Sequence, residues 1–154
     1  MKRIKVGDVL EIPMGDGYAY AQLSHRDPLM GDLIRVFEDI SPTPRADWAA
    51  LVQQHPLFLT FFYISHSVKT GTVKIVGNAP LAEEARAFPL FLCAGLPDDT
   101  TGKPTTWGLW DGHQSRFVDQ VTPELARLPF RESIDEVRLK ERIRKKWRHE
   151  DRMK

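Results

Sequence analysis

The stretch VGDVLEIPMGDGYAYAQL, residues 6–23, predicts a strand, a tight turn and a second strand. The first strand ends at Pro13 after the apolar residues Val9, Leu10 and Ile12, and Met-Gly-Asp-Gly follows at residues 14–17. Asp and Gly favour tight hairpin turns because they tolerate the positive φ that these turns demand. Residues 18–23 then alternate strictly, with two tyrosines and a glutamine on one face and two alanines and a leucine on the other. We therefore expect a hairpin whose alanine face is pressed closely against another element.

Further short runs rich in β-branched and aromatic residues predict a mainly antiparallel sheet of about seven strands. Asp111 and Gly112 have the turn chemistry of a second hairpin, joining residues 107–110 to residues 114–118. The other expected strands are residues 33–40, 57–64, 72–76 and 88–94. The prediction is an α+β fold with a curved sheet or a partly open barrel and a C-terminal helix.

Four segments between these strands carry helix or turn signals. Asp47 and Thr122 are typical N-cap residues and predict short helices after them. Residues 81–86 predict a helical turn, and residues 65–71 predict a turn without a helix.

The last helix is expected from a capping box formed by Ser133 and Glu136. Its apolar residues do not form a single stripe. One line at i, i+4 and i+8 contains Leu139, Ile143 and Trp147. Ile134 and Val137 fall near the opposite side, so the first turn is expected to pack differently from the rest. We expect residues 1–132 to form a β-rich domain, and residues 133–154 to form a basic helix that joins this domain or projects from it.

Charge is distributed unevenly along the chain. Residues 138–154 contain nine Lys/Arg and three Asp/Glu, a net charge of +6. Because the whole chain contains 22 Lys/Arg and 21 Asp/Glu, the preceding residues carry 13 against 18, a net charge of −5. The basic tail is expected either to dock on this acidic body or to contact nucleic-acid phosphates. The phosphate contacts would come from Arg142, Arg144, Lys145 and Lys146.

Length and composition limit the classes of protein to which this chain could belong. The 154 residues suffice for about one domain, and no run approaches the roughly 18 apolar residues of a membrane span. Cys93 is the single cysteine, which excludes an intrachain disulfide and favours a reducing compartment. The basic start leads directly into the first strand pattern without an apolar signal core. We expect a cytoplasmic protein with no membrane partner.

Residue spacing reveals no catalytic or metal-binding motif. The five histidines are scattered, whereas a zinc site needs three or four convergent ligands. Ser65, His66 and Ser67 place hydroxyls beside an imidazole, but sequence neighbours alternate faces and seldom form a working pair. Cys93 lies within an apolar strand pattern, where a thiol usually acts as a small hydrophobe. We expect no metal and no cofactor, and we favour a protein that is not an enzyme.

The order of five segments resembles the bacterial immunity protein family twenty-six. Residues 7–13 read GDVLEIP and residues 16–21 read DGYAYA, before the strand LIRVFEDI at residues 33–40. KIVGNAPL at residues 74–81 matches the family's recurring pattern, and WGLWDG at residues 107–112 fits its final strand and turn. The resemblance covers about residues 4–118 and leaves out the basic tail. Val73 is a departure, since tryptophan often precedes the KIVG-like segment in the family.

The resemblance implies a mainly β domain that protects a bacterium from the toxin of a polymorphic or contact-dependent system. Such immunity proteins bind a cognate toxin stoichiometrically and block its active site without catalysis. An acidic body suits a basic nuclease toxin, because charge complementarity speeds encounter. Loop length and residue type suggest that the toxin contacts would be Asp98, Asp99, Trp107, Trp110 and Asp111. Two alternatives remain: a hydrolase of the phosphotriesterase kind, which the family name also covers, and a nucleic-acid-binding module that uses the basic tail.

Overall fold

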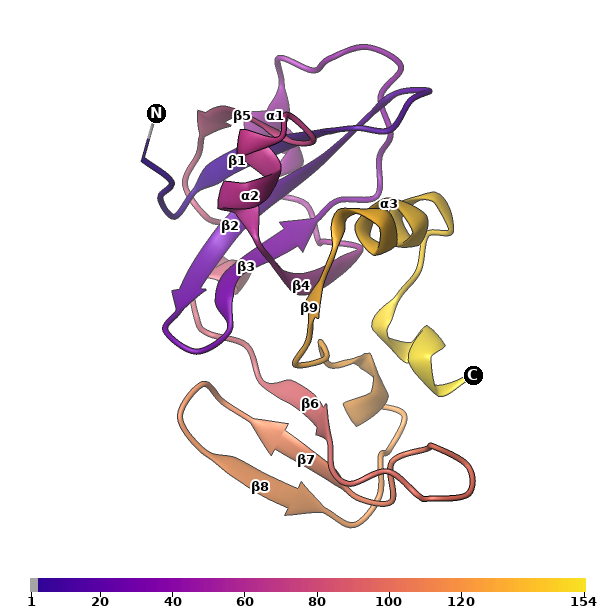
Figure 1. Cartoon of the computed structure of the whole chain (residues 1–154). Coiled ribbons are helices and arrows are strands. Elements are labelled where there is room, and N and C mark those ends of the chain that lie inside the picture. The colour runs from indigo at the N-terminus through magenta and orange to yellow at the C-terminus, as the bar shows by residue number, and fades with distance from the viewer. Residues whose placement is uncertain (1–2) are drawn as a thin grey trace. The chain divides into compact units, whose positions relative to one another are not determined.

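The structure, a computed structural model, describes residues 3–154 (Figure 1). The chain divides into two compact units. The first contains the chain up to Ala87 together with Glu132–Trp147, and the second contains Phe88–Arg131 and Arg148–Lys154. The expected domain boundary between residues 132 and 133 stays a prediction.

A six-stranded sheet forms the centre of the first unit. Its strand order is β5-β1-β2-β3-β4-β9, and all neighbours are antiparallel except β4 and β9, which are parallel. The expected α+β fold with mainly antiparallel strands is confirmed, and the sheet is not closed into a barrel. The strands are β1 (Asp8–Pro13), β2 (Tyr18–Asp27), β3 (Gly31–Val36), β4 (Phe58–Phe62), β5 (Lys74–Asn78) and β9 (Ser133–Ile134).

The hairpin of β1 and β2 has the predicted turn. Pro13 pairs with Tyr18, and the amide of Met14 donates to the carbonyl of Gly17 at 2.8 Å. Gly15 has a φ of 91°, in the left-handed region that a side chain would disfavour. At Gly17 a Cβ atom would come within 2.7 Å of the carbonyl oxygen of Ser41, so this position also requires glycine. The turn therefore depends on the glycines that the sequence pattern singled out.

The two faces of β2 lie in two different apolar clusters. Ala19 and Ala21 belong to the larger cluster, which also contains Leu139 and Ile143 of helix α3 (Glu136–Arg144). Tyr20 lies in the second cluster with Leu51, next to helix α1 (Trp48–Leu51). Small side chains on the alanine face let neighbouring elements approach closely. Ala19, Ala21 and Leu23 are all fully buried in the larger cluster, which agrees with the expected close packing of this face.

Arg35 is the largest of the fully buried side chains in the described residues. Its guanidinium donates to the carbonyls of Val52 and Gln54 at 3.1 and 3.3 Å and lies 3.2 Å from a carboxylate oxygen of Glu84. Glu84 belongs to the 3₁₀ helix η1 (Glu83–Ala85). Burial lowers the pKa of Arg35, and Glu84 partly offsets this effect. These bonds tie the end of α1 and the η1 turn to β3.

Helix α2 (Ile64–Lys69) replaces the turn expected at residues 65–71. Ile64 and Val68, four residues apart, both pack against the larger apolar cluster. This spacing is helical. Ile64 continues the apolar run of residues 57–63 in the sequence, which places it in the expected strand and hides the helical period.

The capping box predicted at Ser133 is wrong. Asp135 is the N-cap of α3, and its side chain accepts a 2.8 Å hydrogen bond from the amide of Arg138. Ser133 and Ile134 instead form β9 and pair with Phe61 and Phe62 of β4. Strand pairing and burial of Ile134 outweigh the local capping signal. They also explain why Ile134 lies off the stripe of the helix.

A three-stranded antiparallel sheet with the order β6-β7-β8 lies in the second unit. Its strands are β6 (Phe91–Ala94), β7 (Trp107–Trp110) and β8 (Ser115–Val118), so the predicted second hairpin is present. The outer edge of β6 is covered by residues 129–131, because Leu92 exchanges backbone hydrogen bonds with Pro129 and Arg131. Two further 3₁₀ helices are η2 (Leu125–Arg127), after the predicted cap at Thr122, and η3 (His149–Met153). Among residues 3–154, no helix has the length and apolar character to cross a membrane.

Candidate functional site

The loop between β6 and β7 carries two of the residues expected to contact a partner, Asp98 and Asp99. One carboxylate oxygen of Asp98 accepts hydrogen bonds from the amides of Thr100 and Thr101 at 2.8 and 2.9 Å. These amides hold the pKa of Asp98 below its ordinary value. Asp99 is exposed. Asp98 therefore shapes the loop, while Asp99 presents its carboxylate to solvent.

The two tryptophans of β7 have different environments. Trp107 is half-buried and packs edge-on against Phe130, with ring centroids 6.1 Å apart. Trp110 is only 4% exposed, because its ring lies against Phe88 and Phe91. The guanidinium of Arg131 lies 4.8 Å from the Trp110 ring centroid. Trp107 is thus accessible to a partner, whereas Trp110 supports the sheet from within.

Asp111 closes the turn between β7 and β8. Its Oδ1 accepts hydrogen bonds from the amides of His113 and Gln114, both at 2.8 Å, and these bonds lower its pKa. Trp110 and Ser115 pair at this end of the hairpin, while Trp107 and Val118 pair at the other. Three residues of strand separate the two ends by about 10 Å. The structure therefore brings Asp98, Asp99 and Trp107 to one end of the sheet and Asp111 to the opposite end.

Two exposed apolar residues near this sheet were not predicted. Phe117 of β8 is 82% exposed and Leu96 of the β6–β7 loop is 80% exposed. Phe117 lies opposite Gly108, which in turn lies opposite Cys93. Because Gly108 has no side chain, the sheet has a hollow of about 150 Å³ here, with Trp107 and Phe117 among its lining residues. The hairpin register, which follows from the Asp-Gly turn, is the sequence signal that could have shown Phe117 facing a glycine.

The basic residues proposed for nucleic-acid contacts have partners within the chain. Arg142 is buried, lies 2.7 Å from Glu132 and stacks over the Trp147 ring. Arg144 donates to the carbonyl of Met14 at 2.8 Å. The two lysines form exposed ion pairs, Lys145 with Glu141 at 2.8 Å and Lys146 with Glu38 at 3.8 Å. This part of the tail docks on its own unit, and its phosphate-binding role stays a prediction.

A larger pocket of about 460 Å³ lies in the first unit. The rings of Tyr63 and His66 are nearly parallel, at 5°, with centroids 6.3 Å apart. Two carboxylates, Asp135 and Glu136, belong to the start of α3. The complete lining is Phe62, Tyr63, His66, Ser67, Thr70, Thr72, Ser133, Ile134, Asp135 and Glu136.

A hydrolase needs titratable, nucleophilic or metal-binding side chains that converge in one pocket. Within residues 3–154 there is no group of three or more His, Cys, Asp or Glu side chains that could hold a metal ion. His66 lines the pocket with Ser67 and two carboxylates. However, none of the hydrogen bonds in the described residues joins its imidazole to a hydroxyl or carboxylate.

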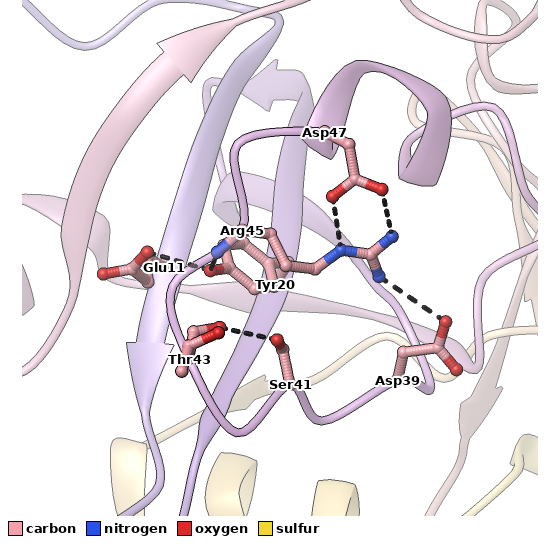
Figure 2. Close-up of polar contacts among 7 residues, drawn as sticks. All are labelled: Glu11, Tyr20, Asp39, Ser41, Thr43, Arg45 and Asp47. Atoms are coloured by element: carbon pink, nitrogen blue, oxygen red, sulfur yellow. Dashed lines mark hydrogen bonds and ion pairs between the residues drawn. The ribbon is translucent and has the colours of Figure 1, made fainter.

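A connected polar cluster surrounds Tyr20 in the first unit (Figure 2). Its hydroxyl donates to Glu11 at 2.9 Å and accepts from the amide of Arg45 at 2.6 Å. The guanidinium of Arg45 forms two 2.8 Å hydrogen bonds with Asp47 and lies 3.6 Å from Asp39. Burial raises the pKa of Tyr20, which keeps the phenol protonated and disfavours a nucleophilic role. The cluster fastens the segment of residues 39–47, which contains Pro42 and Pro44, to the sheet.

Comparison with known proteins identifies no relative of this chain. No protein-family model, no curated protein and no solved structure matches it. The resemblance to the bacterial immunity family thus stays a prediction from short sequence segments.

Proposed function

We propose that this chain is a protein-binding module of the immunity type, which occludes a cognate bacterial toxin without catalysis. The docking face would be the hollow side of β7 and β8 together with the β6–β7 loop. The observation that carries the proposal is the exposure of Phe117 and Leu96 in the unit that also holds the 150 Å³ hollow. The five-segment resemblance to an immunity family supports the same conclusion.

The chemistry of this face suits a protein partner. A partner that covers Phe117 removes a large apolar surface from water, and aromatic anchors carry a disproportionate share of interface energy. The hollow over Gly108 leaves room for a side chain of the partner. β8 is also the last strand of its sheet, so its outer backbone groups are available for pairing with an extended segment.

Charge complementarity favours a basic partner. Asp98 and Asp99 belong to the loop between β6 and β7, which lies at the same end of the sheet as Phe117. Asp99 is exposed. Carboxylates at the rim of an interface mainly speed association and set specificity, and contribute less to final affinity. A toxin that is a basic nuclease has the matching charge.

The proposal predicts that a neighbouring gene encodes a large secreted protein with a toxin-like C-terminal domain, and that domain is the probe for the test. We expect a one-to-one complex by calorimetry and loss of the probe's toxicity when both chains are co-expressed. Phe117→Ala and Leu96→Ala should each weaken binding by about tenfold or more, as anchor residues do.

Leu29→Ala is the matched control, because Leu29 is 71% exposed but lies in the other unit. It should bind like the wild-type chain. Wild-type affinity in the Phe117→Ala, Leu96→Ala double variant would refute the proposed face. Absence of any complex or protection would refute the immunity function itself for this probe.

A further inference from the structure

We propose that the 460 Å³ pocket beside α2 and the start of α3 is a binding site for a guanidinium cation. The pocket lies wholly in the first unit, so this inference is independent of the docking face on the β7–β8 hairpin. The guanidinium group could be supplied by a small molecule or by an arginine side chain of another protein. The charge, the hydrogen-bonding groups and the flat rings of the pocket each favour this chemistry.

The first argument is charge. Asp135 and Glu136 line the pocket, and none of its lining residues, all of them within the described chain, is Lys or Arg. The Oε2 atom of Glu136 is buried and has no hydrogen-bond partner in the described residues. A desolvated carboxylate without a partner is costly, and a nearby cation offsets that cost. The pocket therefore attracts a cation and disfavours an anion.

The second argument is the type of hydrogen-bonding group. Thr72 donates its hydroxyl proton to the carbonyl of Ser67 at 3.0 Å, and Thr70 lies 3.1 Å from the carbonyl of His66. The two hydroxyls also lie 3.2 Å from each other, so their protons are shared between these neighbours, and their remaining lone pairs offer acceptor positions, as the carboxylates do. A guanidinium group has five N–H donors and no acceptor. Its donors thus match a pocket whose walls offer acceptors.

The third argument is shape. The rings of Tyr63 and His66 are nearly parallel, and Tyr63 is 70% exposed. A planar, delocalised guanidinium stacks on such faces, whereas a compact, strongly hydrated ammonium gains less from them. A volume of about 460 Å³ lies within the range of small-ligand sites and exceeds what a single metal ion would need.

The acidic wall is held in place by the fold. The side chain of Asp135 is fixed because it caps α3 through the amide of Arg138. The preceding strand β9 is fixed by its pairing with β4, and the amide of Phe61 also donates to the carbonyl of Glu132 at 3.2 Å. Rigid placement of the carboxylates lowers the entropic cost of binding.

The experiment titrates the full chain with agmatine, L-arginine and a capped Gly-Arg-Gly peptide, followed by calorimetry and by NMR shifts of the Tyr63 and His66 side chains. L-Citrulline, the neutral isostere of arginine, and L-lysine are the ligand controls. We expect saturable binding of at least one guanidinium probe, with citrulline and lysine about tenfold weaker or worse.

Three variants test the assignment. Glu136→Gln should weaken binding by about tenfold, and Tyr63→Ala by about two- to fivefold. Glu141→Gln is the matched control, because it removes the same charge from α3 outside the pocket and should leave binding unchanged. Thermal unfolding of each variant distinguishes a lost contact from a lost fold.

The outcomes separate the two sources of the cation. Preferred binding of agmatine or free arginine assigns a small molecule, and preferred binding of the peptide assigns an arginine side chain. Failure of all three probes to bind, equal binding of citrulline, or full affinity in Glu136→Gln would overturn the proposal.

Discussion

The two sheets of this protein are built from similar antiparallel hairpins but are covered very differently. The six-stranded sheet has an apolar cluster on each face, and residues 8–12 of β1 are all buried. In the three-stranded sheet, Phe117 of β8 is almost fully exposed, and no residue of that strand is buried. The contrast separates a sheet that is covered on both faces from one that leaves a large aromatic side chain exposed to solvent.

Both hairpins use a four-residue connection with Asp and Gly. Pro13 pairs with Tyr18 across the first, and Trp110 pairs with Ser115 across the second. Turn chemistry therefore predicts that a hairpin forms but carries no information about its role. The role depends on what covers the strands.

The largest expected effect is a difference in the free energy of unfolding when a phenylalanine is replaced by alanine in one sheet or in the other. Phe58 of β4 is fully buried and contacts Trp147 edge-on at 5.7 Å. Phe58→Ala should lower the free energy of unfolding by about 3–5 kcal/mol, because it removes apolar contacts and leaves a cavity. Phe117→Ala should change it by less than about 0.5 kcal/mol, as expected for an exposed site. Denaturant titration of both variants measures the difference; equal losses would abolish the contrast between the sheets.

A smaller effect is expected at the polar cluster around Tyr20. Tyr20→Phe removes the hydroxyl that bonds Glu11 and the amide of Arg45. It leaves the buried Glu11 carboxylate without this donor, so we expect a loss of about 1–3 kcal/mol in the free energy of unfolding. Tyr63→Phe is the control at an exposed tyrosine and should be near neutral. If both variants unfold like the wild-type chain, the cluster does not fasten the segment to the sheet.

The same cluster predicts a pH dependence. Burial raises the pKa of Tyr20 above its ordinary value of 10.0, so the fold favours the protonated phenol. This contribution to stability is fully present below the unfolded pKa and is lost as the pH rises through the folded pKa. Ultraviolet titration of phenolate should show a late-ionising component in the wild-type chain that is absent from Tyr20→Phe. An unchanged titration curve would contradict the assignment.

The smallest effect is local and concerns the β6–β7 loop. The pKa of Asp98 is lowered by the amides of Thr101 and Thr100, so the fold favours the ionised carboxylate. Its contribution is present above the unfolded pKa and is lost as the pH falls through the lowered value. Hydrogen exchange at these two amides should therefore become less protected in acid, while global stability changes little. Asp98→Asn should weaken their protection at neutral pH, and Asp99→Asn should not.

Hydrophobic periodicity and turn chemistry predicted most strands of the two sheets. They did not predict α2 and β9, which depend on contacts with residues distant in the chain. The alternation of residues 18–23 predicted β2 and its tightly packed alanine face. Helix α2 was missed because Ile64 continues the apolar run of β4 in sequence while packing as a helical residue. The capping signal at Ser133 was overruled because Ile134 pairs with Phe62, a partner far away in the chain.

The exposed residues of the three-stranded sheet were predicted only in part, because exposure also depends on residues distant in the chain. Residue type suggested Trp107 and Trp110 equally, but exposure depends on neighbours that the sequence does not place, and Phe88 and Phe91 bury Trp110. Phe117 was overlooked because an apolar residue in a strand is usually buried. Its exposure follows from facing Gly108 at the open end of the hairpin.

The parallel pairing of β9 with β4 has a consequence for how sequence change is tolerated. The chain leaves the first unit after Ala87 and returns at Glu132, where β9 rejoins the sheet it left. Residues 88–131 are thus an insertion between two parts of one folding core. In the described chain no residue of that insertion pairs with the six strands, so substitutions at its exposed positions should leave the register of the six-stranded sheet unchanged.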